Sequence, residues 1–415
     1  MPSPATVIHE FLAAHRADAE RFLAALVKFP SDNPPGDCAP HAEHAATLLE
    51  AMGLAVERHP VPAEAVKANG MVSCVNLVVR AKFGGGDGPA IALNAHGDVV
   101  PPGQGWTADP YGAEVRHGVM YGRGVAVSKS DFATYAFALR ALEAAAAAGA
   151  RLDGTVELHF TYDEEVGGAI GPVWLLRQGI SRPDFAISAG FSHGIATAHN
   201  GCLHLEVEVT GRSGHAAEPE QGIDALEAAN GILADLYTLR RTYAAVRSAT
   251  PGIGSPTLVV GLIHGGINTN VVPDKVTFRI DRRIIPEEVP AEVEATLTRR
   301  ICESGAKWPG VIVKVTRILL AMPLVPIPGQ ERLVAVITRH GSALAGEPLR
   351  PHGVPIYTDA RHYTAAGIPT VLYGAGPRTL VEANGHRADE KLALDDLHLA
   401  TEVVALALAD LLAAR

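Results

Sequence analysis

The feature that most constrains the fold is a set of short apolar segments, rich in Val, Ile and Phe, in the first half of the chain. Four of these segments read CVNLVVRA, AIALNAHGDVV, TVELHFTYDEE and DFAISAG. Their length and composition are typical of buried β-strands. A long helical pattern, from about residue 132 to residue 148, separates two of them and favours a parallel crossover. We therefore expect an α/β domain with a doubly wound, mostly parallel sheet.

The pattern changes from about residue 202. The segment CLHLEVEVTG alternates apolar and polar residues with a period of two, as in a sheet with one solvent-exposed face. A helical stretch, two strand candidates, a second helix and a last strand follow it, which gives the order β-α-β-β-α-β. We expect an inserted α+β domain at 202–317, between the two parts of the α/β domain at 1–201 and 318–415.

Composition excludes several classes of protein. The 415 residues are 47% hydrophobic and 19% charged, which is sufficient for a large core and argues against disorder. The formal net charge is −10 and there is no basic stripe, so we expect no nucleic-acid partner. No apolar run reaches the roughly 18 residues of a membrane-spanning helix. The charged N-terminus is unlike a signal peptide, and the four cysteines are far apart in sequence, so we expect free thiols and a cytoplasmic protein.

Polar side chains follow two of the predicted strands. His96 and Asp98 lie two residues apart, so both side chains can point the same way, and Asp98 can orient the imidazole as the partner of a metal-bound histidine does. Glu164 and Glu165 are adjacent and point in different directions, so one can bind a cation while the other acts as a general base on water. A structural role for the first pair and a solvated acidic turn for the second are the alternatives.

Three further segments carry weaker signals. His386 precedes a helix in NGHRADEKL, and His215 has small neighbours in GRSGHAAEPEQG. Arg361, in VPIYTDARHY, has a planar guanidinium group that suits a carboxylate. Taken alone, a structural histidine is the default interpretation of His386 and His215, and an internal ion pair is that of Arg361.

Seven motifs occur in an order that is typical of one family: AHGDVVPPG, YGRG, TYDEEVGG, GRSGHAAEPEQGIDA, GGINTNVVPD, YTDAR and GHRADE. Over nearly its whole length the chain resembles the dinuclear zinc amidohydrolases that include acetylornithine deacetylase, succinyl-diaminopimelate desuccinylase, aminoacylase and glutamate carboxypeptidase. The resemblance implies a metallopeptidase-like catalytic domain with an inserted lid, which in this family also forms the homodimer.

The resemblance also implies roles for individual residues. The positions carried over are the metal ligands His96, Glu165 and His386, the bracing residue Asp98, the general base Glu164, the lid histidine His215, and the anchors Asn270 and Arg361 for a substrate carboxylate. In dimers of this family, the lid histidine reaches the site of the neighbouring subunit and helps to polarise the scissile carbonyl.

Two positions depart from the family pattern. Val127 stands where an Asp bridges the two metals, and no acid stands at Ala189 or Gly190, where the family supplies another ligand. Two divalent cations roughly 3.5–4 Å apart repel each other and need a shared carboxylate. The three remaining ligands, two imidazoles and one carboxylate, suit a single ion, with zinc or manganese as the first candidates and cobalt or iron as alternatives. His193 is a further candidate ligand.

The sequence thus predicts a metal-dependent hydrolase that cleaves the amide bond of a small carboxylate-bearing substrate, such as an N-acyl amino acid or a dipeptide. One alternative is a non-catalytic binding protein of the same fold. Another is an enzyme of altered chemistry that has lost the two-metal site, in which residues 125–127 face an apolar part of the substrate. A further alternative is an ordinary two-metal enzyme whose two missing ligands come from other parts of the chain.

Overall fold

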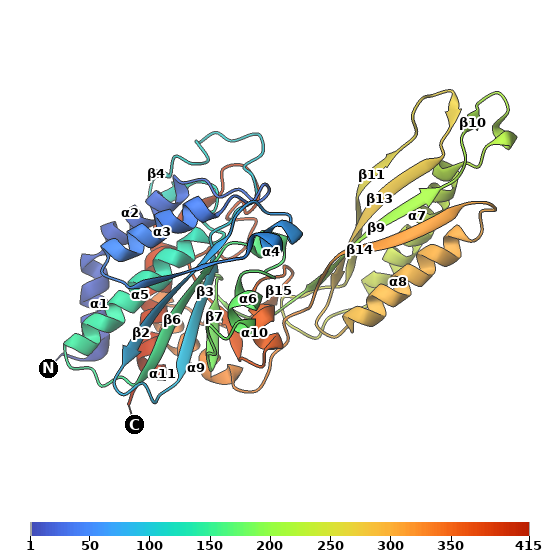
Figure 1. Cartoon of the computed structure of the whole chain (residues 1–415). Helices are drawn as coiled ribbons and strands as arrows, with labels where there is room; N and C mark the ends of the chain where they lie inside the picture. Colours follow the sequence, from blue (N-terminus) through green and yellow to red (C-terminus); the bar gives the residue numbers. More distant parts are fainter. Residues whose placement is uncertain (1, 415) are drawn as a thin grey trace. The chain divides into compact units, whose positions relative to one another are not determined.

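The computed structural model describes residues 2–414, which divide into two compact units (Figure 1). The first unit comprises Met1–Thr197, Pro326–Pro351 and Thr358–Arg415, and the second comprises Ala198–Val325 and His352–Tyr357. The second unit therefore extends a few residues beyond the expected insertion at 202–317 on both sides. It also includes a short returning segment that the sequence pattern did not indicate.

An eight-stranded sheet forms the centre of the first unit, in the order β1-β2-β6-β3-β7-β16-β8-β15. The strands are β1 (Val56–Pro60), β2 (Val75–Phe83), β3 (Ala90–His96), β6 (Gly154–Thr161), β7 (Phe185–Ser188), β8 (Ile195–His199), β15 (Pro351–Val354) and β16 (Thr370–Leu372). The central pairs β6–β3, β3–β7 and β7–β16 are parallel, whereas β1–β2, β2–β6 and β16–β8 are antiparallel. The predicted α/β fold is confirmed, with antiparallel pairs outside its parallel centre.

Helices and a small sheet of order β17-β5-β4 complete the first unit. They are α1 (Pro4–Ala14), α2 (Arg16–Val27), α3 (Ala39–Ala51), α4 (Ala63–Ala68), α5 (Lys129–Ala147), α6 (Pro172–Arg177), α9 (Gln330–Ala345), α10 (Ala360–Ala365), α11 (Leu394–Leu411), β4 (Glu114–Arg116), β5 (Val119–Tyr121) and β17 (Lys391–Ala393). The predicted long helix is α5, which is buried along most of its length and packs against α1, α2 and α11. Its many alanines allow this close approach of other elements.

The strand order determines where the polar motifs meet. Strands β3 and β6 are parallel neighbours that end at His96 and Thr161, so the loops that follow them lie at the same edge of the sheet. The Gly97 amide donates to the Thr161 carbonyl at 2.8 Å, directly beyond these strand ends. The NAHGD and YDEE segments are therefore brought together by the parallel pairing.

The second unit is a four-stranded antiparallel sheet of order β11-β13-β9-β14 with two helices. Its elements are β9 (Gly201–Thr210), β10 (Gly214–His215), α7 (Ala225–Thr242), β11 (Thr257–Gly265), β12 (Val271–Val272), β13 (Lys275–Ile284), α8 (Pro290–Gly305) and β14 (Ile312–Ala321). In β9, Leu203, Leu205 and Val207 are buried in a core that α7 and α8 share. The alternating residues of β9 face the other side of the sheet, as the period-two pattern predicted.

The structure also bears on the exclusions drawn from composition. All four cysteines are free thiols, three of them buried and one exposed. Over the described part of the chain, no helix combines the length and apolarity that a bilayer crossing requires.

We predict that Phe132→Ala destabilises the first unit by about 3–5 kcal/mol, because it removes a large side chain from a packed core. Phe132 of α5 is fully buried and stacks on Phe160 of β6, with ring centroids 3.9 Å apart. Urea unfolding followed by circular dichroism measures the loss. The matched control is Val115→Ala, at a side chain that is 48% exposed, where we expect a change within about 0.5 kcal/mol. Equal losses in the two variants would contradict this assignment of the core.

Candidate active site

The buried carboxylate of Asp98 joins the two loops that follow β3 and β6. Its Oδ1 accepts the backbone N–H of Glu164 at 3.3 Å, and its Oδ2 accepts that of Glu165 at 3.2 Å. Asn33 donates its side-chain amide to the same Oδ2 at 2.9 Å. Three hydrogen bonds to one ionisable group fix the turn that carries the two glutamates relative to the end of β3.

The backbone carbonyl of Asp98 lies closer to the His96 ring than the Asp98 carboxylate does. The His96 Nδ1 lies 2.9 Å from the Asp98 carbonyl oxygen and 3.4 Å from Oδ1 of the carboxylate. A carbonyl can only accept, so Nδ1 carries a proton, and in the neutral imidazole the lone pair is on Nε2. Nε2 lies 4.0 Å from Glu164 Oε2. The imidazole therefore presents a ligand nitrogen toward the acidic turn.

Carboxylates dominate the electrostatics of this site. Burial alone would lower the pKa of His96, but Asp98 and the two glutamates raise it well above its usual value. Burial raises the pKa of Glu164 to about 7, and the charges of Glu165 and Asp98 contribute to the increase. Burial likewise raises the pKa of Asp359 to about 7, assisted by Glu164. Such crowding of acids favours a bound cation, and it gives Glu164 a pKa that is suitable for a general base.

Glu165 lies between two imidazoles. Its carboxylate belongs, with His96 and Glu164, to a set of donors whose ligand atoms all lie within 4.8 Å of one another. Its Oε1 is buried and makes no hydrogen bond, and the Nε2 of His386 lies 3.4 Å from it. His386 is 53% exposed and is outside that compact set. A buried carboxylate oxygen with no hydrogen-bond donor, next to imidazole nitrogens, fits a metal ion.

Arg361 contacts the backbone at the end of the turn that carries Glu164 and Glu165. Its side chain is buried, and it donates to the carbonyl of Thr358 at 2.6 Å and to that of Gly167 at 2.7 Å. Gly167 follows directly after the 3₁₀ turn Glu164–Val166. The guanidinium group therefore holds the end of the acidic turn in place, a contact that the YTDAR motif did not predict.

His215 and Asn270 both belong to the second unit. His215 lies on the short strand β10, and Asn270 directly precedes β12, which pairs with β10. The backbone N–H of Ala216 donates to the Asn270 carbonyl at 3.0 Å, so the two segments lie together. The N–H of Ala217 donates to His215 Nδ1 at 3.1 Å. Nδ1 is therefore an acceptor and Nε2 carries the proton, so the exposed His215 presents a hydrogen-bond donor.

The loop around Val127, where the resemblance led us to expect a bridging acid in the family, is held by Glu390, a residue that the sequence analysis did not single out. Glu390 accepts the backbone N–H groups of Ala126 at 3.1 Å and Val127 at 3.2 Å, and it forms a buried ion pair with Arg123 at 2.6 Å. Val125 and Ala126 are part of the main hydrophobic core. The GRG motif and the acid of GHRADE, 267 residues apart, are the signals that could have suggested this pair.

The segment around Gly190, the second position that departs from the family pattern, and His193 both contact acidic residues. The N–H of Gly190 donates to the fully buried Asp131 at 3.2 Å, so an acid lies near this segment although it comes from α5. His193 lies 2.7 Å from Asp396 and belongs to none of the donor sets found among the described residues. The sequence did not predict these two contacts, because Asp131 is 59 residues from Gly190 and Asp396 is 203 residues from His193.

Comparisons with known proteins agree with this geometry. The sequence matches Peptidase family M20/M25/M40 over residues 92–410. It is 31% identical over 339 residues to an acetylornithine deacetylase of Proteus mirabilis, which covers 80% of each chain. The structure resembles the dipeptidase Dug1p of Saccharomyces cerevisiae (TM-score 0.78, 12% identity, 98% of each chain). It also resembles an M20 family metallo-carboxypeptidase of Sulfolobus solfataricus (TM-score 0.73, 16% identity, 93% of this chain and 97% of the other).

The fold and the site define a metallopeptidase-like hydrolase that acts on C–N bonds. The chain belongs to the M20/M25/M40 peptidase family, and the predicted family, fold and enzyme class are confirmed.

We predict that Glu390→Gln destabilises the protein by about 3–5 kcal/mol, because it leaves the buried charge of Arg123 without an opposite charge beside it. Both side chains are almost completely inaccessible to solvent. Chemical unfolding measures the loss, and the double variant Arg123→Met, Glu390→Gln is expected to recover part of it. Glu114→Gln, which breaks the exposed pair with Arg116, is the control and should cost at most about 1 kcal/mol. A Glu390→Gln variant no less stable than this control would contradict the prediction.

Proposed function

We propose that this protein hydrolyses the amide bond of a small carboxylate-bearing substrate, with N-acyl amino acids of the acetylornithine type as the first candidates and dipeptides as the second. The curated relatives named acetylornithine deacetylase support the first class, and the dipeptidase fold supports the second. The observation that carries the proposal is the largely buried Glu164, with its pKa near 7, beside the unbonded Oε1 of Glu165 and two imidazoles.

We further propose that His96, Glu165 and His386 hold one divalent ion, zinc or manganese first and cobalt or iron as alternatives. The donor chemistry supports this choice, since two imidazoles and one carboxylate form a common set for a single catalytic metal. Val127 offers no carboxylate to a second ion, which supports a count of one. When bound, the ion supplies Lewis acidity, which polarises the substrate carbonyl and makes a water more acidic.

The side chains of the chain carry the proton transfers. Glu164 takes a proton from the attacking water and later gives it to the leaving nitrogen, which a carboxyl with a pKa near 7 can do in both directions. Asp98 keeps the Nε2 of His96 available as a ligand. His215 is the proposed donor to the oxygen on which negative charge develops, because its Nε2 carries the proton.

Other residues are proposed to contact the substrate carboxylate and the partner subunit. Asn270 and Arg361 are the proposed carboxylate anchors, and the carbonyl contacts of Arg361 give it a positioning role for the acidic turn as well.

We also propose a homodimer that forms through the second unit. Its edge strand β11 supports this proposal, because Val259, Leu262 and Ile263 are exposed there.

The proposal is tested by removing metal with a chelator, restoring zinc or manganese, and measuring turnover of N-acyl amino acids and dipeptides. We expect metal-dependent hydrolysis, and we expect Glu164→Gln to lower kcat by about 10²–10⁴-fold with the same metal content. Glu303→Gln, at an exposed side chain of α8, is the control and should retain full activity. Full activity of the metal-free protein would overturn the proposal. Substrate binding without turnover would instead support the non-catalytic alternative.

The pH profile follows from the pKa of Glu164. The base must be ionised, so kcat/KM is expected to fall as the pH decreases through the pKa of Glu164. That pKa is about 7 without a metal, and a bound cation favours the carboxylate, so the midpoint of the acid limb should lie at or below about pH 7. Initial rates between pH 5 and about pH 9 measure this. Activity that increases toward low pH would contradict the assignment of Glu164 as the base.

A further inference from the structure

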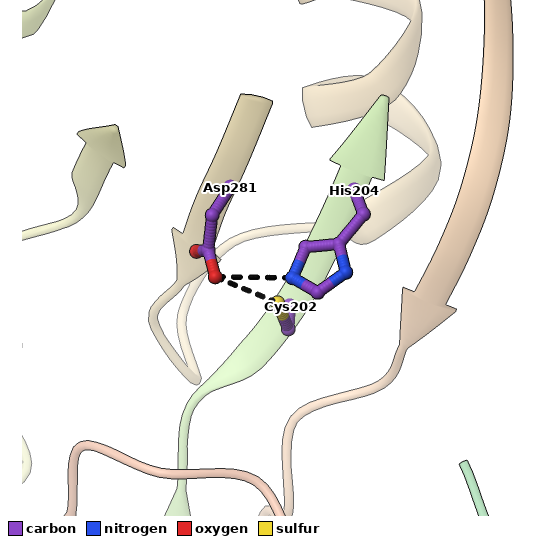
Figure 2. Close-up of side chains that lie close together, drawn as sticks. All are labelled: Cys202, His204 and Asp281. Carbon is purple, nitrogen blue, oxygen red and sulfur yellow. Dashed lines mark hydrogen bonds and ion pairs between the residues drawn. The ribbon is translucent and has the colours of Figure 1, made fainter. Parts of the chain in front are cut away.

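A second cluster of potential metal ligands lies on the second unit and shares no residue with the candidate active site. It consists of Cys202, His204 and Asp281, whose ligand atoms all lie within 4.8 Å of one another (Figure 2). Over the described residues, it is the only set of this kind besides the one around His96. We propose that these three residues bind a zinc ion.

The strand geometry of the sheet brings the three side chains together. Cys202 and His204 are two residues apart on β9, so both point to the face opposite the helices α7 and α8. Asp281 on β13 is the direct cross-strand partner of His204. Figure 2 shows a ring nitrogen of His204 and the sulfur of Cys202 both in contact with one oxygen of Asp281. A site built on paired strands is rigid, which favours metal binding.

The distances already approach those of a zinc site. Nε2 of His204 lies 3.0 Å from Oδ2 of Asp281, and Sγ of Cys202 lies 3.8 Å from the same oxygen. Standard zinc–ligand lengths in a tetrahedron place a nitrogen and an oxygen about 3.4 Å apart, and a sulfur and an oxygen about 3.6 Å apart. Shifts of a few tenths of an ångström would therefore bring both of these pairs to the spacing of a zinc site.

The ligand types select the metal. Magnesium, calcium and manganese prefer oxygen ligands, whereas thiolate selects softer ions. Zinc accepts thiolate, imidazole and carboxylate alike. A thiolate and a carboxylate also supply two negative charges, which balance those of the ion.

The neighbours of the cluster fit the same interpretation. Arg283 donates its Nε to Oδ1 of Asp281 at 3.0 Å, which orients the carboxylate as the outer hydrogen-bond partners of metal ligands do. Its Nη2 also reaches Oδ2, at 3.1 Å, so metal binding has to displace that contact. Cys202 is buried, whereas the side chains of His204 and Asp281 are 33% and 31% exposed. Solvent can therefore deliver the ion and supply a water as the fourth ligand.

Cobalt(II) spectroscopy of the full-length protein tests the proposal. Cobalt bound to a thiolate has a near-ultraviolet charge-transfer band, and the proposed catalytic ligands include no thiolate, so this band reports on the Cys202 cluster alone. We expect the band in the wild-type protein under reducing conditions and its loss when zinc is added. Cys202→Ser should abolish it, and Asp281→Asn should weaken cobalt binding at this site at least about tenfold.

Cys302→Ser is the matched control, because Cys302 is an exposed thiol of α8 in the same unit, and this variant should retain the band. His96→Ala should also retain it, even if the proposed hydrolytic activity is absent, so the two proposals fail separately. A wild-type protein without the band at saturating cobalt would overturn the zinc site and leave a hydrogen-bonded network only. Persistence of the band in a folded Cys202→Ser variant would overturn it equally; if that variant does not fold, His204→Gln takes its place.

Discussion

The catalytic half of this protein depends on the hydrogen bonds that the buried Asp98 carboxylate accepts from the backbone amides of Glu164 and Glu165. The same residue, through its carbonyl, sets the tautomer of His96. One residue therefore fixes the position of both acids through its side chain and the tautomer of the nearest imidazole through its backbone. Its burial strengthens these bonds, because no water competes for them.

That arrangement has an electrostatic cost. Asp98, Glu164, Glu165 and Asp359 gather in a region from which solvent is largely excluded, and burial raises the pKa of Glu164 and of Asp359 to about 7. A protein gains nothing in stability from such crowding, since like charges in a low dielectric repel. Clusters of this kind are typical of sites where a cation compensates the charge. The family membership of the chain agrees with this explanation.

The loop around Val127 has a structural explanation of a different kind. Val125 and Ala126 belong to the core, and Glu390 fixes the backbone of Ala126 and Val127 from the far end of the chain. The ion pair of Glu390 with Arg123 keeps both charges out of water. The apolar residues 125–127 are therefore part of a loop whose backbone is held in a defined position.

The sequence by itself determined the fold class, the polar residues at the strand ends and the family, because strand and helix periodicity and ordered motifs are local properties of the chain. Only the tertiary structure decided which partners these residues meet. Asp98 and Glu164 are 66 residues apart, Ala126 and Glu390 are 264 apart, and His204 and Asp281 are 77 apart. Strand pairing and loop packing create these contacts, and no local pattern records which strand becomes the neighbour of another.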